Sequence, residues 1–327
     1  MKGPTINGTG YFGKLPARGD FVKGGGSAQL IAMLDRWISE SMNLLSTDPR
    51  WRIPYDNMNP VHFAFVGPRS RLSVVGHLQP SHDASARRFP FLVASTIESE
   101  AGHSHPGPLA LSSPWEKFGQ LVGLARTADE PAPMLHALAR IDCTQELAHM
   151  AQASGADAVP ESSTIADIDR LLEHEGHAGN TRSIILALGI LLRPLLGSNR
   201  PTIERGLRLP LPSDVGPRDA MAQVWVNLVS GFVRSTPCEL QLLLAPVAGR
   251  NTLVIGFNGA SPQPLVSLIS PGSAPDAVVS LEDPEWIDTH PDLVGDYGIA
   301  KLSSYLAQPG TTLATALATF REVFFGE

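Results

Sequence analysis

The chain has 327 residues and carries 25 Lys+Arg against 32 Asp+Glu, which gives a net charge of −7. This acidic balance argues against a protein that mainly binds nucleic acid, because phosphate binding needs a concentrated cationic face. The 30 glycines and 28 prolines indicate many turns and short elements around an ordinary core, and the length fits one large domain or two.

The sequence shows no segment typical of export or membrane insertion. Its longest apolar run, Ile184–Leu192, is shorter than the roughly 20 residues that a membrane-spanning helix needs, so we expect a buried helix. The start of the chain, Met1–Asn7, lacks the apolar region of a secretory signal. Cys143 and Cys238 stand apart, without the spacing of a metal site, as is typical of reduced cysteines. We therefore predict a cytoplasmic protein.

In the first half of the chain, glycine-rich turns precede a helix, three strands and further helices. Glycines predict turns at residues 8–13 and 24–26. Apolar side chains then recur every three or four residues from Leu30 to Leu45, which predicts an amphipathic helix with Trp37 on its apolar face. Three β-rich runs, the first two joined by a hairpin turn, and two helices are predicted next: Val61–Val66, Leu72–Leu78, Phe89–Ile97, Trp115–Thr127 and Pro133–Ser154.

Two stretches, Gly102–Pro114 and Ser154–Ser163, have the composition of connectors. A domain boundary in the second predicts an amino-terminal domain over residues 1–155 and a carboxy-terminal α/β domain over residues 164–327. Periodicity predicts these helices and strands in the second domain: Ile165–Glu173, Arg182–Leu196, Asp219–Arg234, Leu240–Pro246, Leu253–Asn258, Ser261–Ile269, Leu293–Leu306 and Thr312–Phe325.

The two halves share a weak sequence echo. Lys14-Leu15-Pro16 with Asp20 resembles Arg208-Leu209-Pro210 with Asp214, and each segment precedes a helix with one tryptophan and then a hairpin. One hypothesis is that the halves arose by duplication; the alternative is that helix-then-hairpin is a common local order. The predicted fold class is α/β of the α+β type, an antiparallel-rich sheet with packed helices.

A glycine pattern near the start of the chain resembles nucleotide-binding loops. Residues Gly8–Gly13 match GxGxxG, and with Lys14 they match the first seven positions of a P-loop. A P-loop needs Ser or Thr after its lysine, where Leu15 stands, and a dinucleotide loop should open a helix, whereas Pro16–Gly19 follows. A structural turn is therefore favoured over a nucleotide site, and we expect no cofactor.

The tripeptide Ser81-His82-Asp83 contains the residue types of a catalytic triad. In an extended segment Ser81 and Asp83 share one face while His82 points to the other, so the three side chains do not converge. Hydrolase chemistry is therefore retained only as an alternative.

Of two histidine pairs, His103/His105 has no third ligand evident nearby, and His174/His177 does not form HExxH and has Gly176 at a weakened helix end. Zinc normally takes at least three protein ligands, so we interpret these histidines as solvated side chains and expect no metal.

Two adjacent arginines, Arg87 and Arg88, lead into the Phe89–Ile97 strand and follow Asp83 by four and five residues. One interpretation is an ion pair with Asp83 that fixes the loop where it enters the sheet. The other is a cationic edge for an acidic or phosphorylated partner, because guanidinium groups suit such anions.

Two segments together resemble the TagF (ImpM) family, accessory proteins of the bacterial type VI secretion system. Residues 10–22, GYFGKLPARGDFV, are similar to the family's amino-terminal signature, and residues 80–91, PSHDASARRFPF, are similar to its Pro-Ser-x-Asp run ending in Arg-x-Phe-Pro. Ala84 and Ala86 stand where the family pattern has Arg and Gly. The candidate interaction or fold-defining residues are Gly13, Lys14, Leu15, Pro16, Arg18, Gly19, Asp20, Phe21, Trp37, Pro80, Ser81, Asp83, Arg87, Arg88, Phe89 and Pro90.

The resemblance implies a longin-like amino-terminal domain and a cytoplasmic, non-enzymatic repressor of type VI secretion. Such a repressor acts through contact with a forkhead-associated scaffold protein, beside a threonine-phosphorylation pathway, and needs no small-molecule substrate. The alternatives are a structural baseplate accessory protein, a hydrolase that uses Ser81, and a nucleotide-binding protein. If the resemblance holds, Arg87 pairs with Asp83 and stabilises the fold, whereas Arg88 serves partner contact.

Overall fold

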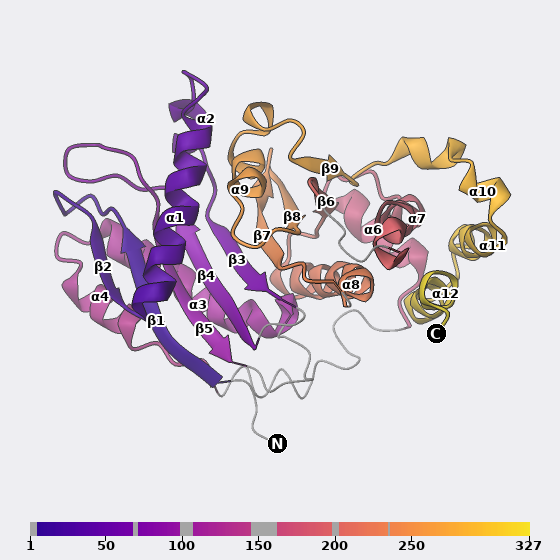
Figure 1. Cartoon of the computed structure of the whole chain (residues 1–327), viewed down its shortest axis with the longest axis horizontal. Coiled ribbons are helices and arrows are strands. Elements are labelled where there is room, and N and C mark those ends of the chain that lie inside the picture. Colours follow the sequence, from indigo (N-terminus) through magenta and orange to yellow (C-terminus); the bar gives the residue numbers. More distant parts are fainter. Residues whose placement is uncertain (1–4, 68–70, 99–106, 145–161, 198–202, 235) are drawn as a thin grey trace.

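One mixed sheet runs through the molecule, with helices on both of its faces (Figure 1). The computed structural model describes residues 5–67, 71–98, 107–144, 162–197, 203–234 and 236–327. The strand order is β2-β1-β5-β4-β3-β7-β8-β6-β9. Within the described residues every strand pair is antiparallel except β6–β9, which is parallel. The predicted α/β fold with an antiparallel-rich sheet is therefore confirmed.

The two halves of the chain meet in this sheet at strands β3 and β7, where His62 lies opposite Leu244 and Val66 opposite Leu240. The domain boundary predicted between residues 155 and 164 stays a prediction, but hydrogen-bonded strands connect the two segments. The strands are β1 (Thr5–Gly13), β2 (Val22–Gly25), β3 (Val61–Val66), β4 (Leu72–Gln79), β5 (Phe91–Glu98), β6 (Gly206–Pro210), β7 (Leu240–Val247), β8 (Arg250–Gly256) and β9 (Val278–Ser280).

Side chains alternate between the two faces of each strand, so the sheet separates two apolar cores. One core lies beneath helices α1 and α9, and the other lies beneath α3 and α8 and extends to the carboxy-terminal helices. The helices are α1 (Ala28–Leu45), α2 (Arg52–Asp56), α3 (Pro108–Thr127), α4 (Ala132–Ala139), α6 (Ile165–His174), α7 (Thr181–Leu192), α8 (Val215–Val233), α9 (Pro262–Ile269), α10 (Asp292–Gly295), α11 (Tyr297–Leu306) and α12 (Leu313–Phe325).

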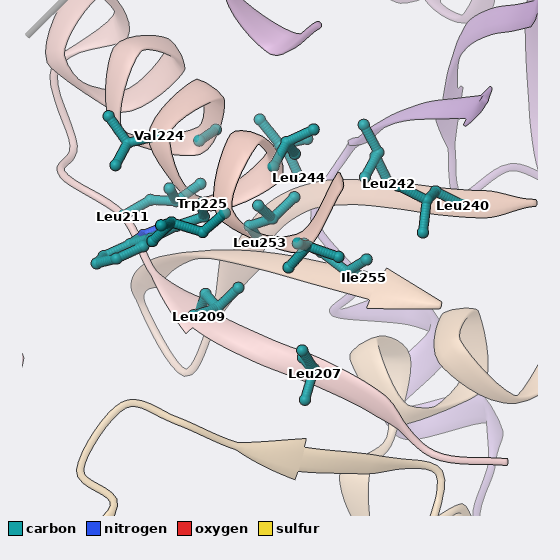
Figure 2. Packing of buried hydrophobic residues seen from close by; sticks show 14 of the residues in the cluster. Leu207, Leu209, Leu211, Val224, Trp225, Leu240, Leu242, Leu244, Leu253 and Ile255 are labelled. Carbon is teal, nitrogen blue, oxygen red and sulfur yellow. The ribbon is translucent and has the colours of Figure 1, made fainter. Parts of the chain in front are cut away.

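Figure 2 shows how the second half fills its share of the larger core. Alternate side chains of three neighbouring strands point toward α8, where Trp225 lies against them. The indole N–H of Trp225 donates to the carbonyl of Pro210 at 3.0 Å, so its one polar atom is satisfied although the ring is buried. The strand residues that Figure 2 labels are Leu207, Leu209, Leu240, Leu242, Leu244, Leu253 and Ile255.

Helix α1 covers the other face and bonds the first half to the second. The side chain of Ser27 caps it by accepting from the Leu30 N–H at 3.1 Å. Trp37 is buried, and its indole N–H donates to the carbonyl of Ser261 at 3.1 Å, just before α9. Two contacts therefore hold the halves together: this hydrogen bond on one face of the sheet, and the β3–β7 pairing within the sheet.

The hypothesis of duplication is not confirmed by the topology. Strand β5 separates β4 from β1 in the first half, whereas β6 pairs directly with β8 in the second. The two tryptophans of the sequence echo also differ in placement, because Trp37 belongs to the smaller core and Trp225 to the larger one.

Several predicted boundaries are corrected by the structure. Residues 8–13, predicted as a turn, belong to strand β1, because that strand is paired on both sides. Part of the predicted connector Gly102–Pro114 is the first turns of α3, which begins at Pro108. The helix predicted over Leu293–Leu306 is broken at Asp296, whose extended backbone ends α10 and whose side chain caps α11.

Some predictions lie outside the described residues, namely His103, His105 and the parts of the predicted helix and connector that fall on residues 145–161. His177, predicted as solvated, is buried and lies 3.3 Å from the carbonyl oxygen of Leu211. None of the helices in the described part of the chain combines the length and apolarity needed to cross a bilayer.

A row of buried and half-buried polar side chains crosses β3 and β4 beneath α3. Arg126 donates to Oε1 of Gln79 at 2.8 Å, which turns the Gln79 amide nitrogen toward Nε2 of His77 at 3.1 Å. That nitrogen of His77 must accept, so its Nδ1 carries the proton and donates to Nδ1 of His62 at 3.0 Å. The always-charged arginine thus sets the direction of every bond in the row, and a second proton on His77 would place two donors face to face.

Both histidines of the row are held neutral. Burial lowers the pKa of His77 to about 4. Burial, together with His77 and Arg218, lowers the pKa of His62 well below its ordinary value. In the unfolded chain these imidazoles titrate near pH 6.5, so the unfolded state binds more protons below that pH.

We predict that the free energy of unfolding falls as the pH drops from about 6.5 toward 4. Buried His77 alone contributes about 1.4 kcal/mol per pH unit in this window, because only the unfolded state takes up its proton. Urea unfolding at several pH values measures the slope. A His77→Gln variant should lose part of it and the exposed His82→Gln variant should keep it; an unchanged slope for His77→Gln would contradict the argument.

Candidate functional site

The two segments that carry the family motif lie side by side in the fold. The loop after β1, residues 14–21, contacts the loop between β4 and β5, residues 80–90; we call the two together the motif junction. The Ala84 N–H donates to the Arg18 carbonyl at 2.8 Å, and Nη2 of Arg87 donates to the Gly19 carbonyl at 2.8 Å. Both segments carry family motifs in the sequence, and the fold brings them together.

The buried carboxylate of Asp83 lies at the centre of the motif junction. Its Oδ2 is 3.0 Å from Nζ of Lys14 and 2.7 Å from Nε of Arg87. Its Oδ1 accepts from the backbone N–H groups of Ser85 at 2.9 Å and Arg87 at 3.0 Å. Four donors therefore satisfy one carboxylate, which allows it to be buried while ionised.

Burial by itself would raise the pKa of the Asp83 carboxyl. The donors outweigh burial and hold that pKa well below its ordinary value. A lowered carboxyl pKa stabilises the fold above about pH 4, where the unfolded carboxyl is also ionised, and the contribution is lost as the pH falls further.

Backbone hydrogen bonds give the β4–β5 loop the shape of a tight hairpin. The Phe89 N–H donates to the Ser81 carbonyl at 3.0 Å, and Asp83 N–H donates to the Arg87 carbonyl at 3.1 Å. The turn is closed by Ala86, whose φ of 60° is in the left-handed region. That conformation suits glycine, the residue that the family pattern has at this position.

Gly13, the last residue of β1, lies directly against the backbone at the end of the β4–β5 loop. Its φ is 133°, and a Cβ atom there would lie 2.1 Å from the Pro90 carbonyl oxygen and 2.7 Å from Cα of Phe91. Both neighbours are backbone atoms and cannot move away, so only glycine fits. This contact explains why glycine precedes the Lys14-Leu15-Pro16 run.

Aromatic rings lie beside the ionic centre. Phe12 stacks on Phe21 at 5.4 Å between ring centroids, and Phe89 meets both rings edge-on at 5.6 and 4.8 Å. Nζ of Lys14 is 5.0 Å from the centroid of the Phe21 ring. Phe21 is 43% exposed, so the aromatic cluster presents one ring to solvent above a fixed cation.

Helix α2 also contacts the β4–β5 loop, through Tyr55 and Asp56. The Tyr55 hydroxyl donates to the Ser81 carbonyl at 2.8 Å and accepts from the Ser81 N–H at 3.0 Å, and burial raises the pKa of Tyr55. Arg88 forms a two-pronged pair with Asp56, with Nε–Oδ1 and Nη2–Oδ2 distances of 2.7 and 2.6 Å. Arg88 was predicted to contact a partner; the structure adds this intramolecular pair, and partner contact stays a prediction.

The alternative chemistries find little support in this geometry. The hydroxyl of Ser81 is buried without a hydrogen-bond partner among the described residues, Asp83 is engaged by Lys14 and Arg87, and Nδ1 of His82 bonds to the carbonyl of Asp83. The glycine pattern lies in strand β1 instead of a loop between a strand and a helix. Among the described residues no group of three or more His, Cys, Asp or Glu could hold a metal ion.

The predicted site residues divide by burial, which the sequence did not reveal. Trp37 is apart from the others, in the core beneath α1. Gly13, Lys14, Leu15, Ser81, Asp83, Phe89 and Pro90 are buried; Pro16, Arg18, Pro80 and Arg88 are half-buried; and Gly19, Asp20, Phe21 and Arg87 are exposed.

A comparison with known protein families gives a match that includes both segments of the motif junction. Residues 10–141 match the family described as "TagF N-terminal domain, Type VI secretion system-associated". This stretch of the chain is similar to TagF N-terminal domains. The resemblance noted from residues 10–22 and 80–91 is confirmed, and the matched residues extend from β1 to the segment just after α4.

Among solved structures, the chain matches PA0076 of Pseudomonas aeruginosa PAO1 with 25% sequence identity and a TM-score of 0.34. The match covers 40% of this chain and 61% of that one, so it spans less than two thirds of the relative. No curated protein matches the chain.

Because Lys14 pairs with the buried carboxylate of Asp83, we expect Lys14 to stabilise the fold. We predict that Lys14→Met lowers the free energy of unfolding by about 3 kcal/mol, because it removes one partner of a buried ion pair and leaves Asp83 under-compensated. Lys301→Met is the matched control, since Lys301 pairs with Glu322 at a similar distance of 2.8 Å at the surface. Thermal melts of both variants test this; equal melting temperatures for the two would show that Asp83 does not depend on Lys14.

Ala86, with its left-handed φ, offers a substitution that is expected to stabilise the fold. We predict that Ala86→Gly raises the free energy of unfolding by about 0.5–1 kcal/mol, because it relieves a left-handed φ in an alanine at some cost in chain entropy. Chemical denaturation measures the change. Ala84→Gly, in the same exposed loop but without a positive φ, should not be stabilising.

Proposed function

We propose that this protein represses type VI secretion by binding a forkhead-associated scaffold protein through the exposed side of the motif junction. The TagF N-terminal domain associates the chain with type VI secretion. Repression, the forkhead-associated partner, cytoplasmic action beside a threonine-phosphorylation pathway, and the absence of enzymatic activity are what the family resemblance implies.

The observation that carries the proposal is the division of the motif into a buried and an exposed part. The buried part closes the two loops on each other, whereas the exposed part contacts them with one side and leaves its other side open to solvent. Phe21 is 43% exposed, and the side chains of Arg18 and Arg87 are 39% and 60% exposed. An aromatic ring among guanidinium groups suits a partner that offers carboxylates or phosphates.

These exposed side chains are also held in place before a partner arrives. Arg87 is fixed by Asp83 and the Gly19 carbonyl, and the Phe21 ring is fixed by Phe12 and Phe89. Little side-chain freedom is then lost on binding, which favours affinity. The proposed mechanism is occlusion, in which the bound scaffold protein is kept from the secretion apparatus.

The proposal predicts that charge reversal at Arg18 weakens scaffold binding by about tenfold or more, because a like charge would then meet the partner's anions. Arg205→Glu is the matched control. Both arginines make a long surface ion pair, Arg18 with Glu130 at 3.8 Å and Arg205 with Asp276 at 3.5 Å, and Nε of Arg205 also donates to the Asp276 carbonyl at 3.0 Å. Arg205 lies beside β6 in the other half. Pulldown from the native bacterium, with secretion measured on overexpression of each variant, tests the prediction.

Two results would contradict this function. One is normal scaffold binding by Arg18→Glu; the other is unchanged secretion both when the gene is deleted and when it is overexpressed. Co-purification with assembled secretion particles, in place of a scaffold protein, would indicate the structural baseplate role.

A further inference from the structure

The end of the molecule opposite the motif junction carries a second exposed apolar surface. Figure 1 places α10 and α11 at the far right and β1 and β2 at the far left. Val294 is 92% exposed and Tyr297 is 85% exposed, and Tyr305 and Trp286 are 39% and 37% exposed. We call these four side chains, with the segment 282–297 that presents most of them, the α10–α11 surface.

The surface is built on an ordered framework. Arg182 at the start of α7 donates to Asp288 and to the Ser303 hydroxyl, each at 2.9 Å. Nη2 of Arg193 lies 2.9 Å from Asp296, which caps α11 by accepting the Gly298 N–H at 2.9 Å. The apolar side chains are therefore exposed on fixed backbone, which lowers the entropic cost of binding through them.

One face of α11 supplies an extended strip. Tyr297, Lys301 and Tyr305 follow one another at four-residue intervals and so share a helix face. The Lys301 ammonium is engaged by Glu322 of α12 at 2.8 and 2.9 Å. The strip thus presents aromatic rings with a neutralised cation between them, a suitable support for the apolar face of another helix.

The segment that presents these side chains is rich in carboxylates. No Lys or Arg occurs from residue 251 to residue 300, whereas six carboxylates stand between residues 282 and 296. Arginines from the start of α7, from the residue just after α7 and from the start of β8 pair with four of them: Asp288, Asp292, Asp296 and Glu282. Within the described residues no ion pair involves Asp283 or Glu285, so the surface keeps a negative excess.

We propose that the α10–α11 surface binds a cationic amphipathic segment of a partner protein, with Lys or Arg beside apolar side chains. The apolar residues of such a segment would cover Val294 and Tyr297, and its cations would meet Asp283 and Glu285. The negative charge disfavours nucleic acid and anionic lipid. It also disfavours a second copy of this chain in a symmetric contact, since that would place carboxylates against carboxylates.

This surface lies at the other end of the sheet from the motif junction and is independent of it. A chain with both surfaces can hold two partners at once, one rich in anions and one rich in cations. Scaffold binding and cationic-segment binding should therefore respond to different substitutions.

The test uses a fluorescent synthetic peptide of Lys and Leu at helical spacing, with a Glu/Leu peptide of the same pattern as the negative probe. Fluorescence anisotropy of the full chain at physiological salt should show binding of the Lys/Leu peptide only. The double variant Val294→Ser/Tyr297→Ser should weaken it about tenfold or more, and so should Asp283→Lys/Glu285→Lys. Ile53→Ser is the matched control, because Ile53 is 64% exposed on α2 in the other half, and it should leave the affinity unchanged.

Three results would overturn the proposal. Equal affinity for all variants would mean that the peptide binds elsewhere, and equal affinity for the Glu/Leu peptide would mean that charge plays no part. A dimer in sedimentation experiments that Tyr297→Ser abolishes would assign the surface to self-association. Scaffold binding measured on the same Val294→Ser/Tyr297→Ser variant should stay normal, so failure here is distinguishable from failure of the motif junction.

Discussion

The buried carboxylate of Asp83 is the constraint on which the amino-terminal half depends. A single anion accepts from two backbone N–H groups, a lysine and an arginine, and the donors come from two loops that are distant in the sequence. An ionised carboxyl can be buried only where every lone pair is satisfied, so the loops must close on each other for either to be stable. The direct backbone contact at Gly13 and the aromatic cluster of Phe12, Phe21 and Phe89 follow from that closure.

The same constraint explains how one motif serves both folding and recognition. Lys14 and Asp83 are buried in their ion pair. Arg87 donates to Asp83 through Nε but keeps 60% of its side chain exposed. The ion pair that closes the loop thus also fixes the orientation of an exposed guanidinium group. A change that loosens the buried pair would therefore alter the binding surface without touching it directly.

The sequence predicted the elements that carry a strong local signal. Strand β3 was predicted with its observed bounds, because its β-branched and aromatic run is bounded by turn residues. Strand β1 was mistaken for a turn because glycine favours turns locally, and only pairing with two neighbours makes it a strand. The pairing of β3 with β7 joins residues far apart in the chain and has no local signature.

The candidate site shows the same division. The Asp83–Arg87 pair was predicted because the two residues are near in sequence, but the partners Lys14 for Asp83 and Asp56 for Arg88 come from distant segments. In the fold, some motif residues are buried and others are exposed or half-buried. The spacing of residues in the sequence does not predict which of them are buried. The α10–α11 surface was not predicted: its segment belongs to a long stretch without Lys or Arg, but only the exposure of Val294 and Tyr297 in the fold makes it a candidate surface.

The β3–β7 pairing also has a consequence for synthesis of the chain. Strand β3 leaves the ribosome long before β7, and until β7 is made the outer edge of β3 presents unpaired backbone groups beside Phe63 and Phe65. Such an apolar edge is a template for pairing between molecules. The nascent amino-terminal half therefore has a period of exposure to aggregation that ends only when the second half supplies its strand. Any rearrangement that separates the two halves of the gene would have to provide a different cover for that edge.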